Sequence, residues 1–335
     1  MHTLLKGLTD KEQEKLVARE LPSWMEPMLA TLTDRCAPDD DWIFERKFDG
    51  ERCLVFCDGR AVRLRSRNKK ILNDTYPELE EALEEIAKAP FVADGEIVAF
   101  EGEVASFSRL QKRMQIRDRE KARQSEVPVF FYLFDLLYLD GFDLCALELR
   151  TRKSLLKVFL SFHDPIRYTE HRSKDGAGYY EDACRKGWEG VIAKRASSCY
   201  HHTRSRDWLK FKCINRQEFV IGGYTDPGGS RIGFGSLLLG YYECDRLIYA
   251  GRVGTGFDDD TLSDLSGRLA AREQKTSPFD GKERPLKGEH FVTPELVCEI
   301  AFTEWTPDGK LRHPRYVGLR DDKSVEDVVR ERPER

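Results

Sequence analysis

The sequence lacks the features that mark several broad classes of protein. No apolar run approaches the length of a transmembrane helix, and the N-terminus lacks the basic-then-apolar layout of a signal peptide. The nine cysteines include no C-x-x-C pair, so neither a zinc finger nor a disulfide framework is indicated. No low-complexity tract and no internal repeat is evident. These absences predict a cytoplasmic globular protein with reduced thiols and no membrane contact.

An excess of positive charge is also missing. The chain carries 55 Lys and Arg against 59 Asp and Glu, a net charge of −4, which argues against a protein that simply coats nucleic acid. The charge is uneven, however, because residues 109–123 and 204–216 are both strongly basic. Each run is either a solvated surface or a contact with a phosphate backbone, and the sequence leaves both readings open.

A chain of 335 residues predicts about two domains. The composition changes near Cys213–Gln217, and residues 219–257 beyond it are rich in glycine, with a Pro-Gly-Gly turn at 227–229. We therefore expect an α+β domain followed by a small β-barrel. Helices are predicted over 78–89 and around 181–186, and strands over 237–242 and 247–253. The expected divisions are a helical leader at 1–21, with a capping box from Thr9 to Glu12, a domain at 22–215, a domain at 216–325 and a charged tail at 326–335.

The most informative segment is the K-x-D-G-x-R pattern that begins at Lys47. Its lysine is a candidate nucleophile, and Arg52 is a fixed cation for a ribose or a phosphate. Gly50 allows the backbone to turn tightly beside that phosphate. Alone, the pattern is also compatible with a surface hairpin turn whose charges are solvated.

Charged residues alternate with apolar residues in four predicted strands. In a strand, residues i and i+2 point to the same face. Four such pairs in one domain predict a concave charged site better than four independent ion pairs do. The pairs are Glu45 with Lys47, Arg65 with Arg67, Asp94 with Glu96, and Lys210 with Lys212.

Each residue type in this set has a chemical use. A lysine nucleophile must lose its proton, and neighbouring cations or a metal help it to do so. Arg52, Arg67, Lys210 and Lys212 provide positive charge for a polyphosphate. Glu96 and Glu189, each expected to lie in an apolar strand, are hard oxygen ligands of the kind that Mg²⁺ takes when phosphate and water fill its other positions. Phe134 is either a stacking surface for a purine or an ordinary core aromatic.

The ordered motifs resemble the ATP-dependent DNA ligases, which belong to the covalent nucleotidyltransferases together with mRNA capping enzymes. The resemblance covers residues 22–325, and its closest form is the ligase module of bacterial and archaeal end-joining enzymes, because of EPMLATL, DGEIVAF and GRVGTGF. The motifs are KFDGER at 47–52, SRN at 66–68, DGEIVAF at 94–100, FDLLYLDG at 134–141, EGVIAKR at 189–195, WLKFK at 208–212 and RHPRYVGLRDDK at 312–323.

The resemblance implies a nucleotidyltransferase domain of antiparallel sheets and helices, followed by an oligonucleotide-binding (OB) barrel. It also implies ATP with Mg²⁺ or Mn²⁺ as cofactors, nicked double-stranded DNA and DNA end-binding repair proteins as partners, and a monomeric, nucleoid-associated enzyme. The resemblance further implies that Lys47 receives AMP, that Glu45 and Phe134 contact adenine, and that Arg52 and Arg67 contact ribose and phosphate. It implies metal binding by Glu96 and Glu189, α-phosphate contacts from Lys210 and Lys212, and a nucleotide contact from Arg206. The implied pyrophosphate contacts come from Arg320, Asp322 and Lys323.

Departures from the family pattern refine this expectation. The 21 residues before the match are too few for the N-terminal DNA-binding domain of the large ligases. The nicotinamide-recognition domain and the four-cysteine zinc site of the NAD-dependent ligases are missing, which favours ATP. The alternatives are an RNA ligase or a GTP-using capping enzyme, and a non-catalytic nucleic-acid-binding protein on the same fold. The FDLLYLDG and RDDK segments favour a DNA ligase over the first, and the retained lysine and acids disfavour the second.

Overall fold

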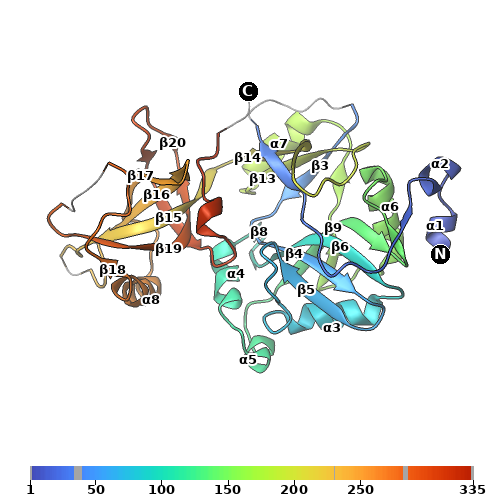
Figure 1. Ribbon diagram of the computed structural model, residues 1–335, viewed down its shortest axis with the longest axis horizontal. Helices are drawn as coiled ribbons and strands as arrows, with labels where there is room; N and C mark the ends of the chain where they lie inside the picture. The colour runs from blue at the N-terminus through green and yellow to red at the C-terminus, as the bar shows by residue number, and fades with distance from the viewer. Residues whose placement is uncertain (1, 34–39, 230, 282–285, 333–335) are drawn as a thin grey trace. The chain divides into compact units, whose positions relative to one another are not determined.

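The computed structural model describes residues 2–33, 40–229, 231–281 and 286–332 (Figure 1). The chain divides into two compact units, the first ending at Cys213 and the second running from Ile214 to Arg332. None of the helices within the described ranges combines the length and the hydropathy that crossing a bilayer requires.

The first unit alternates short strands with helices. Its helices are α1 (Thr3–Lys6), α2 (Asp10–Gln13), α3 (Pro77–Ile86), α4 (Phe107–Met114), α5 (Arg119–Arg123), α6 (Leu149–Phe159) and α7 (Gly176–Arg185). Its strands are β1 (Val17–Ala18), β2 (Leu29–Leu32), β3 (Trp42–Lys47), β4 (Glu51–Cys57), β5 (Val62–Ser66), β6 (Phe91–Val98), β7 (Phe100–Glu101), β8 (Val104–Ala105), β9 (Phe130–Leu139), β10 (Phe142–Asp143), β11 (Ile166–Tyr168), β12 (His171–Arg172), β13 (Gly190–Arg195) and β14 (Arg204–Lys212).

Two sheets organise this unit. The larger has the order β1-β10-β9-β6-β4-β5 with β11 beside β9, and the smaller has the order β12-β3-β13-β14-β2. Most neighbours are antiparallel, while β11 with β9 and β14 with β2 are parallel pairs. The strand after the K-x-D-G turn therefore belongs to a different sheet from the strand before it, because β3 lies in the smaller sheet and β4 in the larger.

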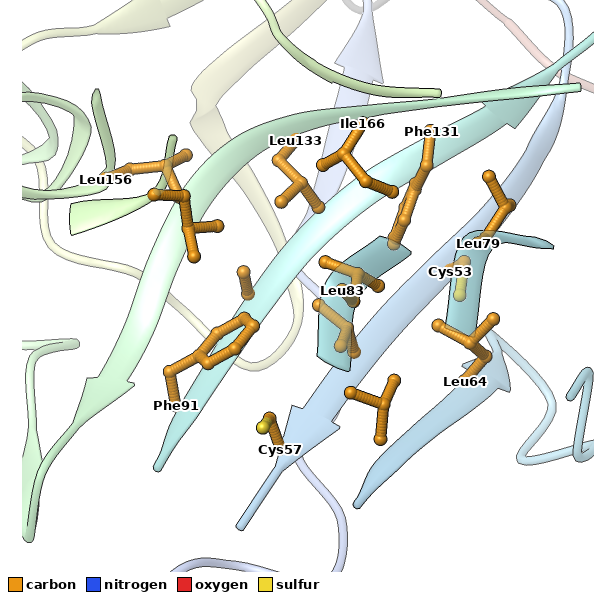
Figure 2. Packing of buried hydrophobic residues seen from close by; sticks show 14 of the residues in the cluster. Cys53, Cys57, Leu64, Leu79, Leu83, Phe91, Phe131, Leu133, Leu156 and Ile166 are labelled. Carbon is orange, nitrogen blue, oxygen red and sulfur yellow. The ribbon is translucent and has the colours of Figure 1, made fainter. Parts of the chain in front are cut away.

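Three apolar clusters hold the sheets in place. The largest joins one face of the larger sheet to α3 and α6, with residues such as Phe91, Leu83 and Leu156 packed together (Figure 2). A second joins its other face to the smaller sheet, through Phe134 and Trp208 among others. A third packs α7 against the outer face of the smaller sheet around Phe44. Side chains on the inner face of the smaller sheet therefore point toward the larger sheet.

The second unit contains β15 (Asn215–Thr225), β16 (Leu237–Glu243), β17 (Arg246–Val253), α8 (Asp259–Ala270), β18 (Glu273–Gln274), β19 (Glu289–Phe302), β20 (Glu304–Trp305), β21 (Leu311–Arg312), β22 (Arg315–Leu319) and the 3₁₀ turn η1 (Val325–Asp327). Its strands form one larger antiparallel sheet and a separate pair, β20 with β21. The sheet has the order β17-β16-β15-β19-β18, with β22 beside β19, and its core includes three leucines of α8. Register shifts in several of its strand pairs mark β-bulges, which bend strands.

Several local predictions are confirmed. The expected helices correspond to α3 and to the end of α7, and the two expected strands of the second unit are β16 and β17. The capping box of Thr9 and Glu12 starts α2. The segment predicted as a charged tail is partly structural, because Val328 is buried in the core of the second unit and its carbonyl accepts a hydrogen bond from the amide of Tyr242.

Two strand assignments need correction. Arg67 lies in a turn, because β5 ends at Ser66, so it does not alternate with Arg65 along one strand. Glu189 precedes β13 and does not lie inside it. Arg67 thus follows the last residue of its strand, and Glu189 precedes the first residue of its strand.

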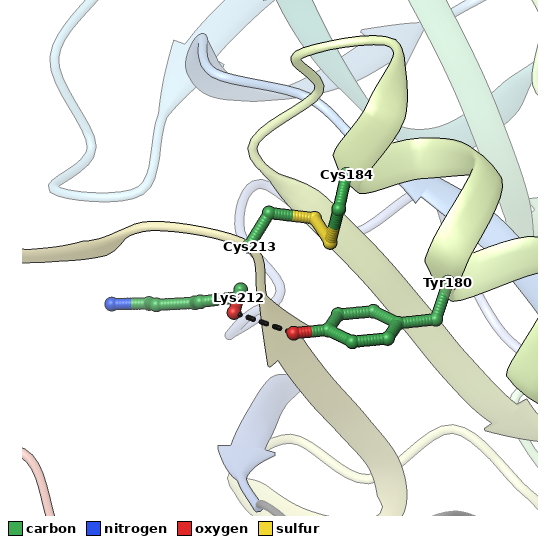
Figure 3. The surroundings of a disulfide bond; sticks show 4 residues. All are labelled: Tyr180, Cys184, Lys212 and Cys213. Atoms are coloured by element: carbon green, nitrogen blue, oxygen red, sulfur yellow. Dashed lines mark hydrogen bonds between the residues drawn. A yellow bond between two sulfur atoms is a disulfide. The ribbon is translucent and has the colours of Figure 1, made fainter.

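The expectation that the thiols are all reduced is wrong for two of them. Cys184 of α7 and Cys213 form a disulfide (Figure 3). Beside it, the Tyr180 hydroxyl donates to the carbonyl of Lys212 at 3.0 Å. The end of β14 is thus attached to α7 twice, at the residue where the first unit ends. The six cysteines that are free among the described residues are Cys53, Cys57, Cys145, Cys199, Cys244 and Cys298.

Candidate active site

Lys47 ends β3 and points between the two sheets. Its neighbours Phe44 and Arg46 belong to the other face, where Phe44 packs in the cluster beneath α7. Strand alternation therefore places Glu45 and Lys47 on the inner face. The Lys47 ammonium is largely buried and forms an ion pair with the carboxylate of Glu189.

Carboxylates control the protonation of Lys47. Burial alone would lower the pKa of its ammonium, but the carboxylate of Glu189, assisted by those of Asp49 and Glu96, outweighs burial and raises the pKa above its ordinary value. The sequence led us to expect neighbouring cations or a metal that would favour the free amine. In the structure the neighbouring carboxylates act in the opposite direction and favour the protonated amine.

Gly190 lies between two lysines on adjacent strands, and the three residues, directly opposite one another across the sheet, form a row. In the smaller sheet it lies opposite Lys47 on one side and opposite Lys212 on the other. A Cβ at this position would lie 1.9 Å from the carbonyl oxygen of Phe211, and its φ is +156°, so only glycine fits. With strands about 4.8 Å apart, the α-carbons of the two lysines are roughly 10 Å apart.

The next row repeats this arrangement two residues along. Ile192 lies opposite Glu45 on β3 and opposite Lys210 on β14. Trp208 belongs to the cluster between the sheets, so alternation along β14 turns Lys210 and Lys212 toward the same side. Both lysines are partly buried.

Gly50 is required for a reason other than the one expected. The sequence suggested that it provides a tight turn, yet its φ is not in the left-handed region. A Cβ there would lie 2.3 Å from the carbonyl oxygen of Ile97. Glycine at this position therefore allows the turn after Lys47 to approach β6, which carries Glu96.

Arg52 is anchored by a buried carboxylate. Its Nε and Nη2 donate to the two oxygens of Asp94 at 2.5 and 2.6 Å, and Asp94 also accepts from the Tyr200 hydroxyl at 2.6 Å. Burial alone would lower the pKa of Arg52, but Asp94 raises it. The guanidinium is thus a cation of fixed orientation, and it lies 4.7 Å from the centre of the Phe134 ring.

Phe134 is placed by a β-bulge. Asp94 lies opposite Asp135, and Gly95 lies opposite Leu133, so Phe134 is the extra residue of β9. Bulges of this kind redirect side chains, and the ring enters the cluster between the sheets, where 7% of the residue is exposed. The ammonium of Lys194 lies 4.0 Å from the ring centre.

Glu45 is buried between two lysines. Its oxygens pair with Lys153 of α6 at 2.6 Å and with Lys194 of β13 at 2.7 Å. Burial would raise the pKa of the Glu45 carboxyl, but the two ammonium groups outweigh it and lower that pKa. Burial lowers the pKa of Lys194 to about 8, although Glu45 acts against this shift.

Glu96 and Glu189 reach Lys47 from different elements. Glu96 lies opposite Arg52 in the larger sheet, and its charge raises the pKa values of both Arg52 and Lys47. Among the described residues no group of three or more Asp, Glu, His or Cys side chains could by itself hold a metal ion. The donor set of two carboxylates fits Mg²⁺ or Mn²⁺ where phosphate oxygens and water complete the coordination.

The remaining predicted nucleotide contacts lie on different elements. Arg206 is exposed near the start of β14, and Arg67 lies in the turn after β5, the edge strand of the larger sheet. These two residues therefore come from separate sheets, whereas Lys210 and Lys212 share the sheet that carries Lys47.

The predicted pyrophosphate residues form a separate cluster in the second unit. Arg320 donates to both oxygens of Asp322 at 2.9 Å and to Glu299 at 3.3 Å. Lys323 pairs with Glu218 at 3.0 Å. Glu218 and Glu299 lie opposite each other on β15 and β19, so the motif is fixed to two neighbouring carboxylates.

Part of the basic run at 109–123 is structural. Arg113 is fully buried, and it donates to both oxygens of Glu78 at 2.8 and 2.7 Å. Arg119 and Arg123 pair with Glu80 and Glu81 of the same helix, α3. The buried Arg113 is therefore structural, and Arg119 and Arg123 are paired with carboxylates of α3 at the surface.

Sequence reasoning missed Lys153 and the site role of Lys194. Lys153 lies four residues after Leu149 and three before Leu156, on the buried face of α6. A lysine at an apolar position of an amphipathic helix was the available signal. Lys194 lies in the EGVIAKR motif and alternates with the buried Ala193, which also indicated an inward side chain.

Comparisons with known proteins now decide the family. Residues 27–212 match the ATP dependent DNA ligase domain, and residues 230–323 match the ATP dependent DNA ligase C terminal region. The chain belongs to the ATP-dependent DNA ligases. The α+β nucleotidyltransferase domain and the OB-fold domain expected from the sequence are the architecture of this family.

Two curated relatives are end-joining proteins. The multifunctional non-homologous end joining DNA repair protein LigD of Mycobacterium tuberculosis (strain ATCC 25618 / H37Rv) is 41% identical over 311 residues, which are 91% of this chain and 40% of that protein. The LigD protein of Pseudomonas aeruginosa is 37% identical over 322 residues, 93% of this chain and 37% of that protein. The chain thus spans about two-fifths of these relatives.

An archaeal ligase and a solved structure extend the comparison. The DNA ligase of Halorubrum lacusprofundi is 30% identical over 351 residues, 96% of this chain and 57% of that protein. The structure described as mycobacterial DNA ligase D complexed with ATP and MES matches with a TM-score of 0.67 and 39% identity, covering 92% of this chain and 98% of that one.

Proposed function

We propose that this chain seals 5′-phosphate/3′-hydroxyl nicks in double-stranded DNA with ATP. Lys47 attacks the α-phosphate of ATP, a lysine N–P bond forms, and pyrophosphate leaves. The AMP then passes to the 5′-phosphate of the nick, freeing Lys47, and the 3′-hydroxyl attacks that phosphate and releases AMP. One observation carries this proposal. In a chain of the ligase family, the buried Lys47 and Lys212 lie on the two strands that flank Gly190, each directly opposite that glycine.

The residues around Lys47 suit the first displacement. Lys47 must transfer a proton before its nitrogen can attack, and its ion-pair partner Glu189 is the carboxylate in position to hold that proton. Lys210 and Lys212 neutralise the α-phosphate, and the anchored Arg52 contacts ribose and phosphate. A divalent cation held by Glu96 and Glu189, Mg²⁺ or Mn²⁺, would supply further charge neutralisation at the phosphate.

The second unit would act on the leaving pyrophosphate. We propose that it closes over ATP by a hinge near Cys213–Gln217, bringing Arg320 and Lys323 to the nucleotide. Asp322 orients the Arg320 guanidinium through two hydrogen bonds. Once AMP is attached, no pyrophosphate remains, and the unit is free to contact DNA.

The biological setting is proposed from the relatives. Two LigD proteins are end-joining proteins by name, which supports a role in DNA repair and contact with DNA end-binding proteins. A monomeric, nucleoid-associated enzyme fits that role. An RNA ligase or a capping-type enzyme on the same fold is the alternative, distinguished by nucleotide and by nucleic acid.

The test is a labelling experiment with ATP labelled at the α-phosphate. The wild-type protein should become covalently labelled and should release the label on addition of nicked DNA. Lys47→Ala should remain unlabelled, whereas Lys157→Ala, at an exposed lysine of α6, should label normally. Parallel reactions with GTP and with nicked RNA separate the alternatives. Equal labelling of Lys47→Ala would refute the assignment.

A further inference from the structure

Lys153 connects Glu45 and Phe134, the two residues for which the sequence resemblance implies adenine contacts. Its ammonium pairs with the Glu45 carboxylate at 2.6 Å and donates to the Phe134 carbonyl at 3.4 Å. It also donates to the Thr169 carbonyl at 3.0 Å and lies 4.7 Å from the centre of the Tyr168 ring. One buried side chain of α6 therefore contacts four different residues around the site.

A fully buried lysine is uncommon, because removing an ammonium from water is costly unless it is paired. Lys153 is 1% exposed, and Glu45 is 2% exposed. A hydrophobic residue at this position of α6 would avoid the cost of burying the charge. The arrangement therefore indicates that the charge of Glu45, and its orientation, matter for the site.

We propose that Lys153 is a positioning residue that keeps Glu45 ionised and aimed as a hydrogen-bond acceptor, and thereby selects 6-amino over 6-oxo purine triphosphates. This inference rests on the proposed adenylation of Lys47. An ionised carboxylate only accepts hydrogen bonds, so it suits the exocyclic amine of adenine. A protonated carboxyl can donate, so it suits the 6-oxo group of inosine or guanine.

The other groups around Glu45 do not replace Lys153. Lys194 is the second cation on the carboxylate, but it is also the lysine whose pKa burial lowers to about 8. Asp135 is paired with Arg152 through two hydrogen bonds and is not available to either lysine as a full partner. The other titratable groups whose charge interacts with that of Glu45 are Tyr168, His171 and Tyr179.

Removing Lys153 should change the protonation of Glu45. With one cation lost and burial unchanged, the pKa of the carboxyl rises. Glu45 then takes up a proton more readily at lower pH and becomes able to donate to a 6-oxo group. A purely structural role of Lys153 would reduce labelling by all nucleotides alike. It would not change the preference between 6-amino and 6-oxo purine triphosphates.

The experiment compares labelling of Lys47 by ATP and by inosine triphosphate in the same protein sample. Wild type should prefer ATP, with a ratio that stays constant between about pH 6 and 8. In Lys153→Met the ratio should fall on the order of tenfold, as expected for loss of a hydrogen bond to a charged group, and should fall further at the lower pH. Because both nucleotides are tested on one sample, the ratio does not depend on the folded fraction.

Two further variants sharpen the result. Lys157→Met changes a lysine one turn later on α6 that also lies over the Tyr168 ring, at 4.9 Å, but pairs with the exposed Glu170. It should keep the wild-type ratio. Lys153→Arg retains the charge and should keep most of the preference for ATP. Loss of the preference in Lys153→Arg to the same extent as in Lys153→Met would overturn the charge argument.

The outcomes separate this inference from the proposed function. If wild type labels with neither nucleotide, the proposed ligase activity fails, and this inference fails with it. If wild type labels and prefers ATP, but Lys153→Met keeps the preference at both pH values, only the role of Lys153 is refuted.

Discussion

Lys47 and Gly190 lie directly opposite each other on β3 and β13, and Gly190 also lies opposite Lys212. The glycine has no side chain between the two lysines, and the backbone of β14 passes so close that a Cβ would meet the Phe211 carbonyl at 1.9 Å. The spacing between the candidate nucleophile Lys47 and Lys212, the candidate phosphate contact, therefore depends on a residue that has no reactive group.

Gly190→Ala should abolish self-adenylation. The added methyl group must displace β14, which moves Lys210 and Lys212 away from the α-phosphate, and errors of about 1 Å in such positions are costly. Labelling with ATP measures the loss. Gly267→Ala is the control, because nothing lies within 4 Å of a Cβ there and α8 gains a better helix former. Normal labelling of Gly190→Ala would show that the row is not needed.

Stability should rise with pH through the titration of Lys194. Burial lowers the pKa of this ammonium in the folded state to about 8, from an ordinary value of 10.5. Between these values the unfolded chain binds more protons than the folded one, so the free energy of unfolding increases with pH. Lys194→Met should lack this contribution. Denaturant unfolding of both proteins from about pH 7.5 to 10 gives the difference between their free energies of unfolding at each pH. A difference that does not change with pH would contradict the lowered pKa of Lys194.

The disulfide should contribute to the stability of the first unit in non-reducing buffer. Cys184 and Cys213 are 29 residues apart, and closing a loop of this length typically adds about 2–4 kcal/mol. Cys213→Ser should lower the free energy of unfolding by that amount, and reductant should lower the wild type equally. Cys244→Ser, at an exposed free cysteine, should behave like the wild type. Urea unfolding with and without reductant measures all three.

Lys323 should matter for loading AMP and not for sealing. If it acts on pyrophosphate, Lys323→Ala loses labelling by ATP but still joins a nick supplied with its 5′-phosphate already adenylated. Glu218→Gln removes the ion-pair partner of Lys323 and keeps the lysine. It should therefore retain labelling. An equal loss in both variants, or equal loss of both reaction steps, would indicate that the pair is structural.

The local part of the site could be predicted from the sequence. The K-x-D-G-x-R pattern, the order of the later motifs and the alternation of Glu45 with Lys47 are properties of short segments, and a strand places alternate residues on one face whatever it packs against. The same holds for the capping box at Thr9 and for the boundaries of β16 and β17. Strand ends were less reliable, as Arg67 and Glu189 show.

Short segments therefore determined the candidate residues of the site and the family to which the chain belongs. Only the tertiary structure decided how their charges are paired, because pairing depends on contacts between residues distant in the chain. Lys153 and Glu45 are 108 positions apart by their residue numbers, and Arg113 meets Glu78 across α4 and α3. The same applies to the disulfide, which requires the end of β14 to lie against α7. Burial strengthens each of these pairings, since an ammonium or a carboxylate removed from water must find a partner.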